Sequence, residues 1–196
     1  MQLKIKVKVG NITNLSDARY CAGMGVDLLG FPIGDAEGQI PFDSFREIVG
    51  WVSGPAFVLE YSDTMNEDEF QKVTESTAIQ YIQLKYSQLR QLGTKVAHLP
   101  IILKTDITEW STIEANLSTY DISYLVLTKN NSVNWKQVEE INKKVKILIP
   151  YSQIEDINEI ELLPITGILL EGTSEDKPGQ KNYDHLAPVL ESLEVY

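Results

Sequence analysis

The chain alternates between short β-like apolar runs and stretches of helical spacing, and it does so eight times within 196 residues. The apolar run at 26–31, for example, is followed by Phe42, Phe45, Ile48 and Val49, which recur at the spacing of one helix face. Strands that alternate with helices predict βα units and a parallel sheet, because parallel strands need a crossover connection. The connections between these elements are short, so the chain has little room for large loop insertions.

The alternation predicts strands and helices in strict order along the chain. The expected strands are 3–9, 26–31, 56–59, 79–84, 100–103, 124–127, 145–149 and 165–170, and the expected helices begin near Asn14 or Ser16 and at about 42, 67, 87, 110, 135, 154 and 183. An open, doubly wound sheet is the alternative. Eight units in fewer than 200 residues favour a closed sheet, which buries every strand on both faces. We therefore expect an α/β fold with a single, minimal-length (β/α)8 TIM barrel over residues 1–196.

Charge and apolar patterning exclude several kinds of partner. The formal net charge is −11, so the chain has no basic surplus for a nucleic acid or an anionic membrane surface. No apolar run is long enough to cross a bilayer. The first residues alternate like a strand and do not form the apolar core of a signal peptide. We expect a cytoplasmic protein with no nucleic-acid or membrane partner, present as a monomer or homodimer.

Cysteine and histidine are too scarce for a metal centre. Cys21 is the only cysteine, and His98 and His185 are the only histidines. This excludes an internal disulfide and argues against a structural metal site. Cys21 lies in the middle of an expected helix, where a free cysteine usually packs as a small apolar residue. We expect no metal and no cofactor.

Several segments resemble the phosphoribosylanthranilate isomerase family, in the family's order. Residues 8–18 read KVGNITNLSDA and 25–31 read GVDLLGF, similar to its opening signature and second strand. Weaker matches are IQLK at 82–85, YLVLT at 124–128, TGI at 166–168 and PGQK at 178–181. The resemblance implies the (β/α)8 fold and an Amadori rearrangement of an aminoaldose phosphate in tryptophan biosynthesis. It also implies a general base on the first strand and a general acid on the sixth.

The positions that the family uses for chemistry carry other residues here. The family's base, a cysteine, corresponds to Gly10, and its acid, an aspartate, corresponds to Thr128. Other family positions read Asn11 for a glycine, Gln39 for the carboxylate-binding arginine, Lys85 for a histidine, Pro150 and Tyr151 for the phosphate-binding glycines, and Glu171, Gly172 and Thr173 for Ser-Ser-Gly. Pro150 has no N–H to give to a phosphate.

Polar residues at the expected strand ends are the remaining candidates. Glu60, Lys85, Lys104, Asp106, Thr128, Lys129 and Glu171 should gather at the carboxyl-end mouth of the barrel. They either neutralise one another in a vacated pocket, which we favour, or form a remodelled anion or sugar-phosphate site. Fallback catalytic candidates are Asp106, Glu60 and Lys104. Candidate ligand-binding residues are Lys8, Asn11, Gln39, Gln83, Lys85, Lys104, Thr128, Gly172, Thr173 and Ser174.

Three functional hypotheses follow from these residues. The first is a family member with little or no isomerase activity that binds a small phosphorylated or carboxylated molecule. The second is an active isomerase in which Asp106 or Glu60 is the base and a lysine is the acid. The third is a non-catalytic interaction or regulatory protein. Loss of both acid and base favours the first, because each typically contributes about 10²–10⁴-fold to a rate.

Overall fold

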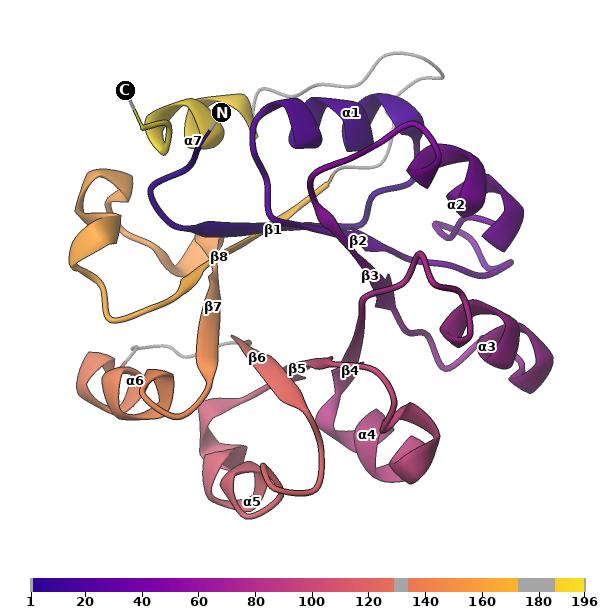
Figure 1. Cartoon of the computed structure of the whole chain (residues 1–196). Coiled ribbons are helices and arrows are strands. Elements are labelled where there is room, and N and C mark those ends of the chain that lie inside the picture. Colours follow the sequence, from indigo (N-terminus) through magenta and orange to yellow (C-terminus); the bar gives the residue numbers. More distant parts are fainter. Residues whose placement is uncertain (1, 129–133, 173–185, 196) are drawn as a thin grey trace.

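Eight parallel strands close into a barrel in the computed structural model, which describes residues 2–128, 134–172 and 186–195 (Figure 1). Each strand pairs with its neighbour in sequence, and β8 pairs with β1 to close the sheet. The strands are β1 Lys6–Gly10, β2 Leu28–Phe31, β3 Ala56–Glu60, β4 Tyr81–Lys85, β5 Ile101–Thr105, β6 Ile122–Leu127, β7 Lys146–Pro150 and β8 Gly167–Glu171. This confirms the (β/α)8 expectation and removes the open sheet as an alternative.

Helices form a ring around the barrel (Figure 1). The described α-helices are α1 Leu15–Gly23, α2 Phe42–Val49, α3 Glu67–Thr74, α4 Tyr86–Leu92, α5 Trp110–Glu114, α6 Trp135–Asn142 and α7 Ala187–Ser192. Short 3-10 helices add η1 Gly93–Val96, η2 Ile107–Glu109, η3 Tyr151–Gln153 and η4 Ile157–Leu162. The side-chain oxygens of Asn14 and Asn66 cap α1 and α3 by accepting backbone N–H groups at 2.9 Å. No helix among the described residues is both long and apolar enough to cross a membrane.

Two expectations about the elements are wrong. The segment between β7 and β8 forms the 3-10 helices η3 and η4 instead of an α-helix. Pro164 follows closely and disfavours helical backbone at Leu163, so only a short, tight helix fits. The first strand begins at Lys6 rather than at residue 3, because Leu3 instead bridges to Glu194 near the end of the chain.

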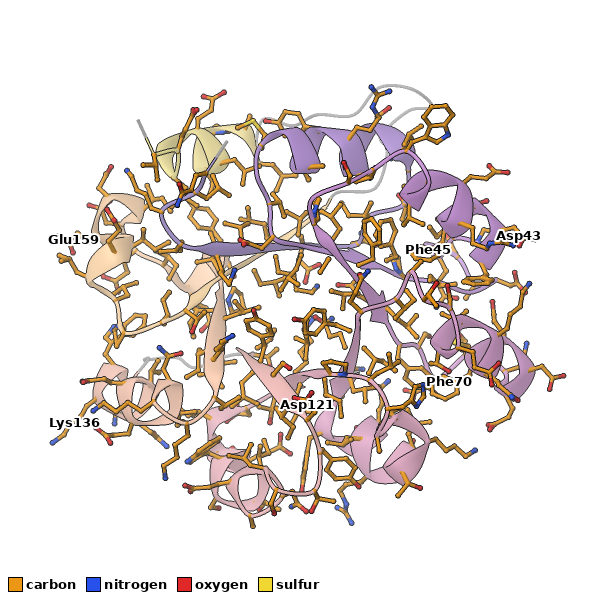
Figure 2. The ribbon with its side chains drawn as sticks, viewed as in Figure 1. Asp43, Phe45, Phe70, Asp121, Lys136 and Glu159 are labelled. Atoms are coloured by element: carbon orange, nitrogen blue, oxygen red, sulfur yellow. The ribbon has the colours of Figure 1, made fainter. Side chains whose placement is uncertain are left out.

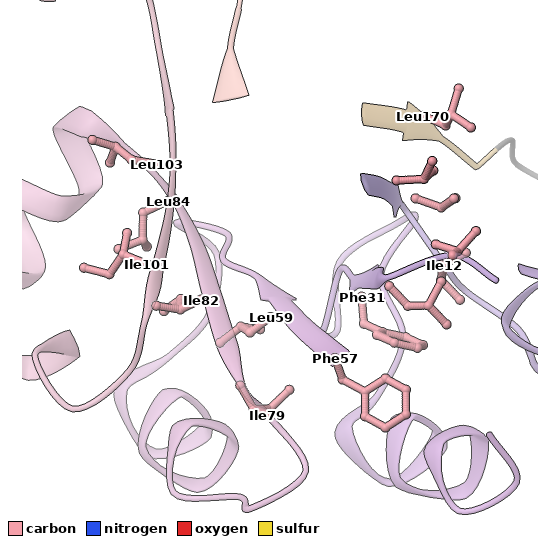
Figure 3. Close-up of a cluster of buried hydrophobic side chains, with 14 of the residues drawn as sticks. Ile12, Phe31, Phe57, Leu59, Ile79, Ile82, Leu84, Ile101, Leu103 and Leu170 are labelled. Atoms are coloured by element: carbon pink, nitrogen blue, oxygen red, sulfur yellow. The ribbon is translucent and has the colours of Figure 1, made fainter. Parts of the chain in front are cut away.

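Apolar side chains pack on both sides of the sheet. The larger cluster lies between the strands and the helices, where Phe31, Phe57, Leu59 and Ile82 project outward (Figure 3). A smaller cluster fills the barrel itself and consists of Leu28, Val58, Ile102, Tyr124, Val126, Leu148 and Leu169. The inward positions nearer the carboxyl ends of the strands are polar, and they form the candidate site. Figure 2 shows the charged side chains Asp43, Lys136 and Glu159 on the outer ring instead.

Candidate functional site

A fully buried lysine lies inside the barrel just below the carboxyl ends of the strands. Lys8 lies between Val7 and Val9, which belong to the outer apolar cluster, so its side chain points inward. It has no exposed surface, and its Nζ lies 2.5 Å from Oε1 of Glu60 on β3. The Glu60 side chain is 14% exposed. A buried charge is tolerated when it is paired in this way, so each residue is needed to hold the other.

Glu60 also accepts hydrogen bonds from residues at or just beyond the carboxyl ends of β1 and β4. Its Oε2 accepts the backbone N–H of Asn11 at 2.9 Å, and its Oε1 accepts a long hydrogen bond of 3.4 Å from Nε2 of Gln83. Asn11 adopts a left-handed backbone with φ of 56°, a conformation that glycine takes most easily and asparagine tolerates. This explains how Asn11 can stand where the resemblance leads us to expect glycine. Its side chain donates to the carbonyl oxygen of Gly172 at 3.1 Å.

Gly10 and Gly30 leave the space that this charged group fills. A Cβ at Gly30 would lie 2.2 Å from Oε1 of Glu60 and 2.7 Å from Nζ of Lys8. A Cβ at Gly10 would lie 2.7 Å from Oε2 of Glu171 and 2.7 Å from Oε1 of Glu60. Contacts this short do not occur for real Cβ atoms, so any larger residue at either position must displace a carboxylate. The glycines at positions 10 and 30 therefore provide the space that the inward carboxylates of Glu60 and Glu171 occupy.

A second, looser ion pair lies at the rim of the mouth. Nζ of Lys104 on β5 is 3.7 Å from Oε1 of Glu171, the last residue of β8, and the Glu171 side chain is about half exposed. Partial burial raises the pKa of the Glu171 carboxyl, and repulsion from Glu60 raises it further, while Lys8 and Lys104 oppose the change. We name Lys8, Glu60, Gln83, Lys104 and Glu171 the mouth cluster. Its two lysines and two glutamates cancel formally in charge.

The raised pKa of Glu171 predicts a pH-dependent gain in stability for Glu171→Gln. A carboxyl whose pKa is higher in the folded than in the unfolded state stabilises the fold fully below its unfolded pKa of about 4.3, and it loses this contribution as the pH rises through the folded pKa. Glutamine resembles the protonated form, so the variant should melt at a higher temperature than the parent at pH 7. The difference should vanish near pH 3. Thermal unfolding from pH 3 to 8 measures this.

A matched control separates this effect from a general change of charge. Glu159→Gln removes one exposed carboxylate from η4, far from the mouth (Figure 2). Its melting temperature should differ from that of the parent by a small amount that does not grow between pH 4 and 7. If Glu171→Gln were less stable than the parent at pH 7, the electrostatic description of the rim would be wrong.

The other candidates have separate surroundings. Thr128 follows β6 and donates its hydroxyl to the carbonyl oxygen of Thr105 at 3.2 Å. Asp106 caps η2 by accepting the N–H and hydroxyl of Thr108, and these hydrogen bonds lower the pKa of its carboxyl. Gln39 lies in the loop after β2, where its Oε1 accepts the N–H of Ala36, and its Nε2 donates to Thr64 in the loop after β3 at 3.3 Å.

Lys85 is exposed at the end of β4, at the edge of the mouth cluster, and it pairs in register with Lys104. Gly172 continues the β1–β8 pairing, since its N–H donates to the carbonyl oxygen of Gly10 at 2.8 Å. Thr173, Ser174, Lys129 and His185 lie outside the described residues. Of the strand-end candidates, the structure therefore brings Lys8, Glu60, Gln83, Lys104 and Glu171 together, and it leaves Asp106 and Gln39 apart.

The remaining histidine and the cysteine are not part of this site. Cys21 is fully buried in α1, as expected for a packing role. His98 is exposed in the turn before β5, at the opposite end of the strand from the mouth. The described residues include no group of three or more histidine, cysteine, aspartate or glutamate side chains suited to a metal ion.

Glu171 is the site residue whose importance the sequence alone understates. Its place at a strand end predicts only a charge at the mouth that would repel a phosphate. The alternation of β8 places it on the inward face together with Gly167 and Leu169, and the β1–β8 register sets it beside Gly10. A glycine on one strand next to a strand-end carboxylate on its neighbour is the signal that could have identified it.

No family model matches the chain, but curated proteins that are similar to it in sequence are phosphoribosylanthranilate isomerases. The N-(5'-phosphoribosyl)anthranilate isomerase of Petrotoga mobilis is 28% identical over 193 residues, which cover 91% of each protein. The isomerase of Bacillus cereus is 23% identical over 157 residues, 72% of this chain and 73% of that protein. Both similarities extend over most of the chain, as the spread of the family-like motifs along the sequence predicts.

Solved structures agree on the fold. The phosphoribosylanthranilate isomerase of Thermotoga maritima superposes with a TM-score of 0.71 at 16% identity, over 96% of this chain and 98% of that one. The isomerase of Thermus thermophilus gives a TM-score of 0.69 at 19% identity, with the same coverage. Together these comparisons show that the chain is similar in sequence to phosphoribosylanthranilate isomerases and shares their (β/α)8 fold.

Proposed function

We propose that this barrel has little or no phosphoribosylanthranilate isomerase activity and that it binds a small carboxylated or phosphorylated molecule at its carboxyl-end mouth. The observation that carries the proposal is the pair of carboxylates at Gly10. The position that the resemblance assigns to the family's base has no side chain, and the space where one would begin is 2.7 Å from Glu171 and Glu60. Any residue that restores the base must first displace them.

The position assigned to the acid supports the same conclusion. Thr128 has a hydroxyl that does not ionise near neutral pH, and this hydroxyl already donates to a backbone carbonyl. A general acid and a general base typically contribute about 10²–10⁴-fold each, so losing both should leave little of the family rate. The two fallback bases are poorly suited, since Asp106 caps η2 and Glu60 accepts three hydrogen bonds. These contacts count against an isomerase with Asp106 or Glu60 as its base.

A ligand that contains a carboxylate fits the mouth better than one that relies on a phosphate. A relative has been solved with reduced 1-(o-carboxyphenylamino)-1-deoxyribulose 5-phosphate, which carries both groups. In this chain Pro150 has no N–H, the N–H of Gly172 is occupied by Gly10, and Glu171 repels a dianion. Lys85 is exposed at the end of β4 as a positive charge for a carboxylate, in register with Lys104, which pairs with Glu171.

Complementation of a tryptophan auxotroph that lacks the isomerase tests the proposal in cells. We expect no growth without tryptophan when this chain is expressed, and normal growth with the Petrotoga mobilis relative as the control. Equilibrium titration of the purified protein with anthranilate, which has a carboxylate and no phosphate, and with the reduced phosphate compound tests binding. Growth at the rate given by the control would refute the loss of activity, and absence of any binding at millimolar ligand would refute the binding role.

Three broader expectations stay predictions. We predict one domain over residues 1–196 and a cytoplasmic location. We also predict a monomer or homodimer. A dimeric isomerase from Thermotoga maritima has been solved as monomers generated from the dimer. An interaction or regulatory role would gain support from a stable homodimer, which light scattering measures directly.

A further inference from the structure

The amino-end opening of the barrel contains lysine and tyrosine side chains instead of the branched apolar residues that usually fill a (β/α)8 interior. Lys6 on β1 and Lys146 on β7 each precede a residue of the outer apolar cluster, so both lysines point inward. Tyr124 on β6 belongs to the inner cluster, and Tyr81 on β4 packs against it. These four strands are spread around the barrel, so the four side chains converge near the amino ends of the strands (Figure 1).

These side chains and Asp27 form one group, which we name the amino-end cluster: Lys6, Asp27, Tyr81, Tyr124 and Lys146. The ring centroids of Tyr81 and Tyr124 are 5.9 Å apart in an edge-to-face arrangement, and Nζ of Lys146 lies 5.4 Å from the centre of the Tyr124 ring. Nζ of Lys6 donates to Oδ1 of Asp27 at 2.9 Å. This hydrogen bond raises the pKa of Lys6 against the opposing effect of burial, and the phenols of Tyr124 and Tyr81 raise it further. Both phenols therefore lie within electrostatic reach of Lys6.

One positive charge in the amino-end cluster is not balanced. Asp27 is occupied by β1, because its Oδ1 accepts from Lys6 and its Oδ2 accepts the backbone N–H of Val7, both at 2.9 Å. Lys146 is exposed and forms no ion pair with the residues that the structure describes. Its contact with the face of the Tyr124 ring is a cation–π attraction, which leaves its N–H groups available to an acceptor. The chain has a net charge of −11, so this opening is positive on an otherwise acidic protein.

The hydroxyl of Tyr124 gives independent support for a ligand at this opening. The residue is only 5% exposed, and its hydroxyl has no hydrogen-bond partner within the described part of the chain. The fully buried side-chain atoms that lack a partner there belong to Asn14 and Gln83, so the Tyr124 hydroxyl is still reached by solvent. Burial raises the pKa of this phenol, which therefore stays protonated and able to donate. Polar groups of buried residues are nearly always paired, so an acceptor from solvent or from a ligand is expected here.

A hollow of about 560 Å³ beside Lys6 provides room for the body of such a ligand. It opens between the segments that precede β1, β2 and β8, and its walls include Lys4, Lys6, Asp27, Ile165 and Thr166. Gly167 on β8 is the register partner of Lys6, and a Cβ at this glycine would collide with the carbonyl oxygen of Lys6. No side chain from β8 can therefore fill this level of the barrel. The volume lies within the range of about 300–1,000 Å³ that is usual for small-molecule sites.

We propose that the amino-end opening binds a small organic monocarboxylate, whose carboxylate accepts from Nζ of Lys146 and from the hydroxyl of Tyr124 and whose body enters the hollow beside Lys6. A charged and a neutral donor at one point suit a carboxylate, which accepts through two oxygens. One unbalanced positive charge matches a monoanion, whereas a phosphate group carries nearly two negative charges at neutral pH. This site is at the opposite end of the strands from the mouth cluster, so the inference does not depend on the proposed function.

Titration with benzoate, followed through the NMR signals of ring-labelled tyrosines in the full-length protein, tests the inference. The variants Tyr124→Phe and Tyr151→Phe assign one signal at each end of the barrel, because Tyr151 follows β7 at the carboxyl end. Millimolar benzoate should shift the Tyr124 signal to a saturating value. Lys146→Met should weaken the apparent affinity by about 10-fold or more, the usual effect of losing one charge-assisted hydrogen bond. Lys136→Met removes an exposed cation from α6 and should leave the affinity unchanged (Figure 2).

The position of the shifted signal separates this inference from the proposed function. A shift of Tyr151 alone would place benzoate at the carboxyl-end mouth and overturn the inference. No saturable shift of Tyr124 at millimolar benzoate, or equal affinity in Lys146→Met with the folded state verified by circular dichroism, would overturn it as well. Inorganic phosphate is the second probe, and a shift of Tyr124 at lower concentrations of phosphate than of benzoate would refute the choice of a carboxylate. Turnover of phosphoribosylanthranilate bears on the proposed function and leaves this site unaffected.

Discussion

Replacing Lys8 by methionine should lower the free energy of unfolding by about 3–5 kcal/mol, the usual cost of removing one partner from a buried ion pair. Methionine keeps most of the volume, so the loss comes mainly from Glu60, which would remain 14% exposed without its cation. Small domains have only about 5–15 kcal/mol of stability in total. Urea unfolding followed by circular dichroism measures the change.

Two further variants keep this prediction open to refutation even if Lys8→Met fails to fold. Lys8→Met with Glu60→Gln removes both charges, and it should recover much of the loss because no uncompensated charge is then buried. Lys6→Met is the matched control on the same strand. Lys6 is 44% exposed and pairs with Asp27 at 2.9 Å, so its loss should cost about 1 kcal/mol or less. Equal effects of Lys8→Met and Lys6→Met would show that the inner pair has no special role.

Restoring the family's acid and base alone should not restore its activity. In Gly10→Cys with Thr128→Asp, the new cysteine must displace the carboxylates of both Glu171 and Glu60, each of which lies 2.7 Å from its Cβ position. Nearby carboxylates also raise the pKa of a thiol and reduce the thiolate that acts as a base. We expect turnover of phosphoribosylanthranilate by this double variant to stay at the level of the parent.

Removing the Glu171 carboxylate from the double variant should restore part of the turnover that the double variant lacks. Glu171→Ser introduces the residue that the resemblance implies at this position, removes one of the two carboxylates that crowd the new Cβ on β1 and removes a charge that repels phosphate. Adding it to the double variant should raise kcat/KM by at least about 10-fold, a fraction of what one acid or base typically contributes. Full activity in the double variant alone would show that the carboxylates do not block the site.

The eightfold alternation was enough to predict the barrel, because few folds accommodate eight βα units in so short a chain. It could not predict the 3-10 geometry of η3 and η4, since apolar spacing at Ile154, Ile157 and Ile160 is compatible with either kind of helix. That choice depends on Pro164 and on how little chain separates β7 from β8. The start of the first strand was off by three residues, because Leu3 pairs with a residue near the end of the chain.

The site was harder to predict than the fold. Lysine alternates with apolar residues along 4–9, which in most strands puts the lysines in water. In a closed barrel the face away from the helices is the interior, so Lys8 is buried instead. Its need for Glu60 follows from three-dimensional register, which spacing in a single sequence does not encode. The same holds for Glu171, whose importance depends on Gly10 across the β1–β8 pair.

The central claim is that inward carboxylates occupy the space that the family's base would need. Steady-state turnover of phosphoribosylanthranilate by the purified parent protein, measured beside the Petrotoga mobilis relative, tests it most directly. We expect kcat/KM to be lower than that of the relative by about 10⁴-fold or more, as the combined loss of an acid and a base implies. A value within about 10-fold of the relative would contradict the claim.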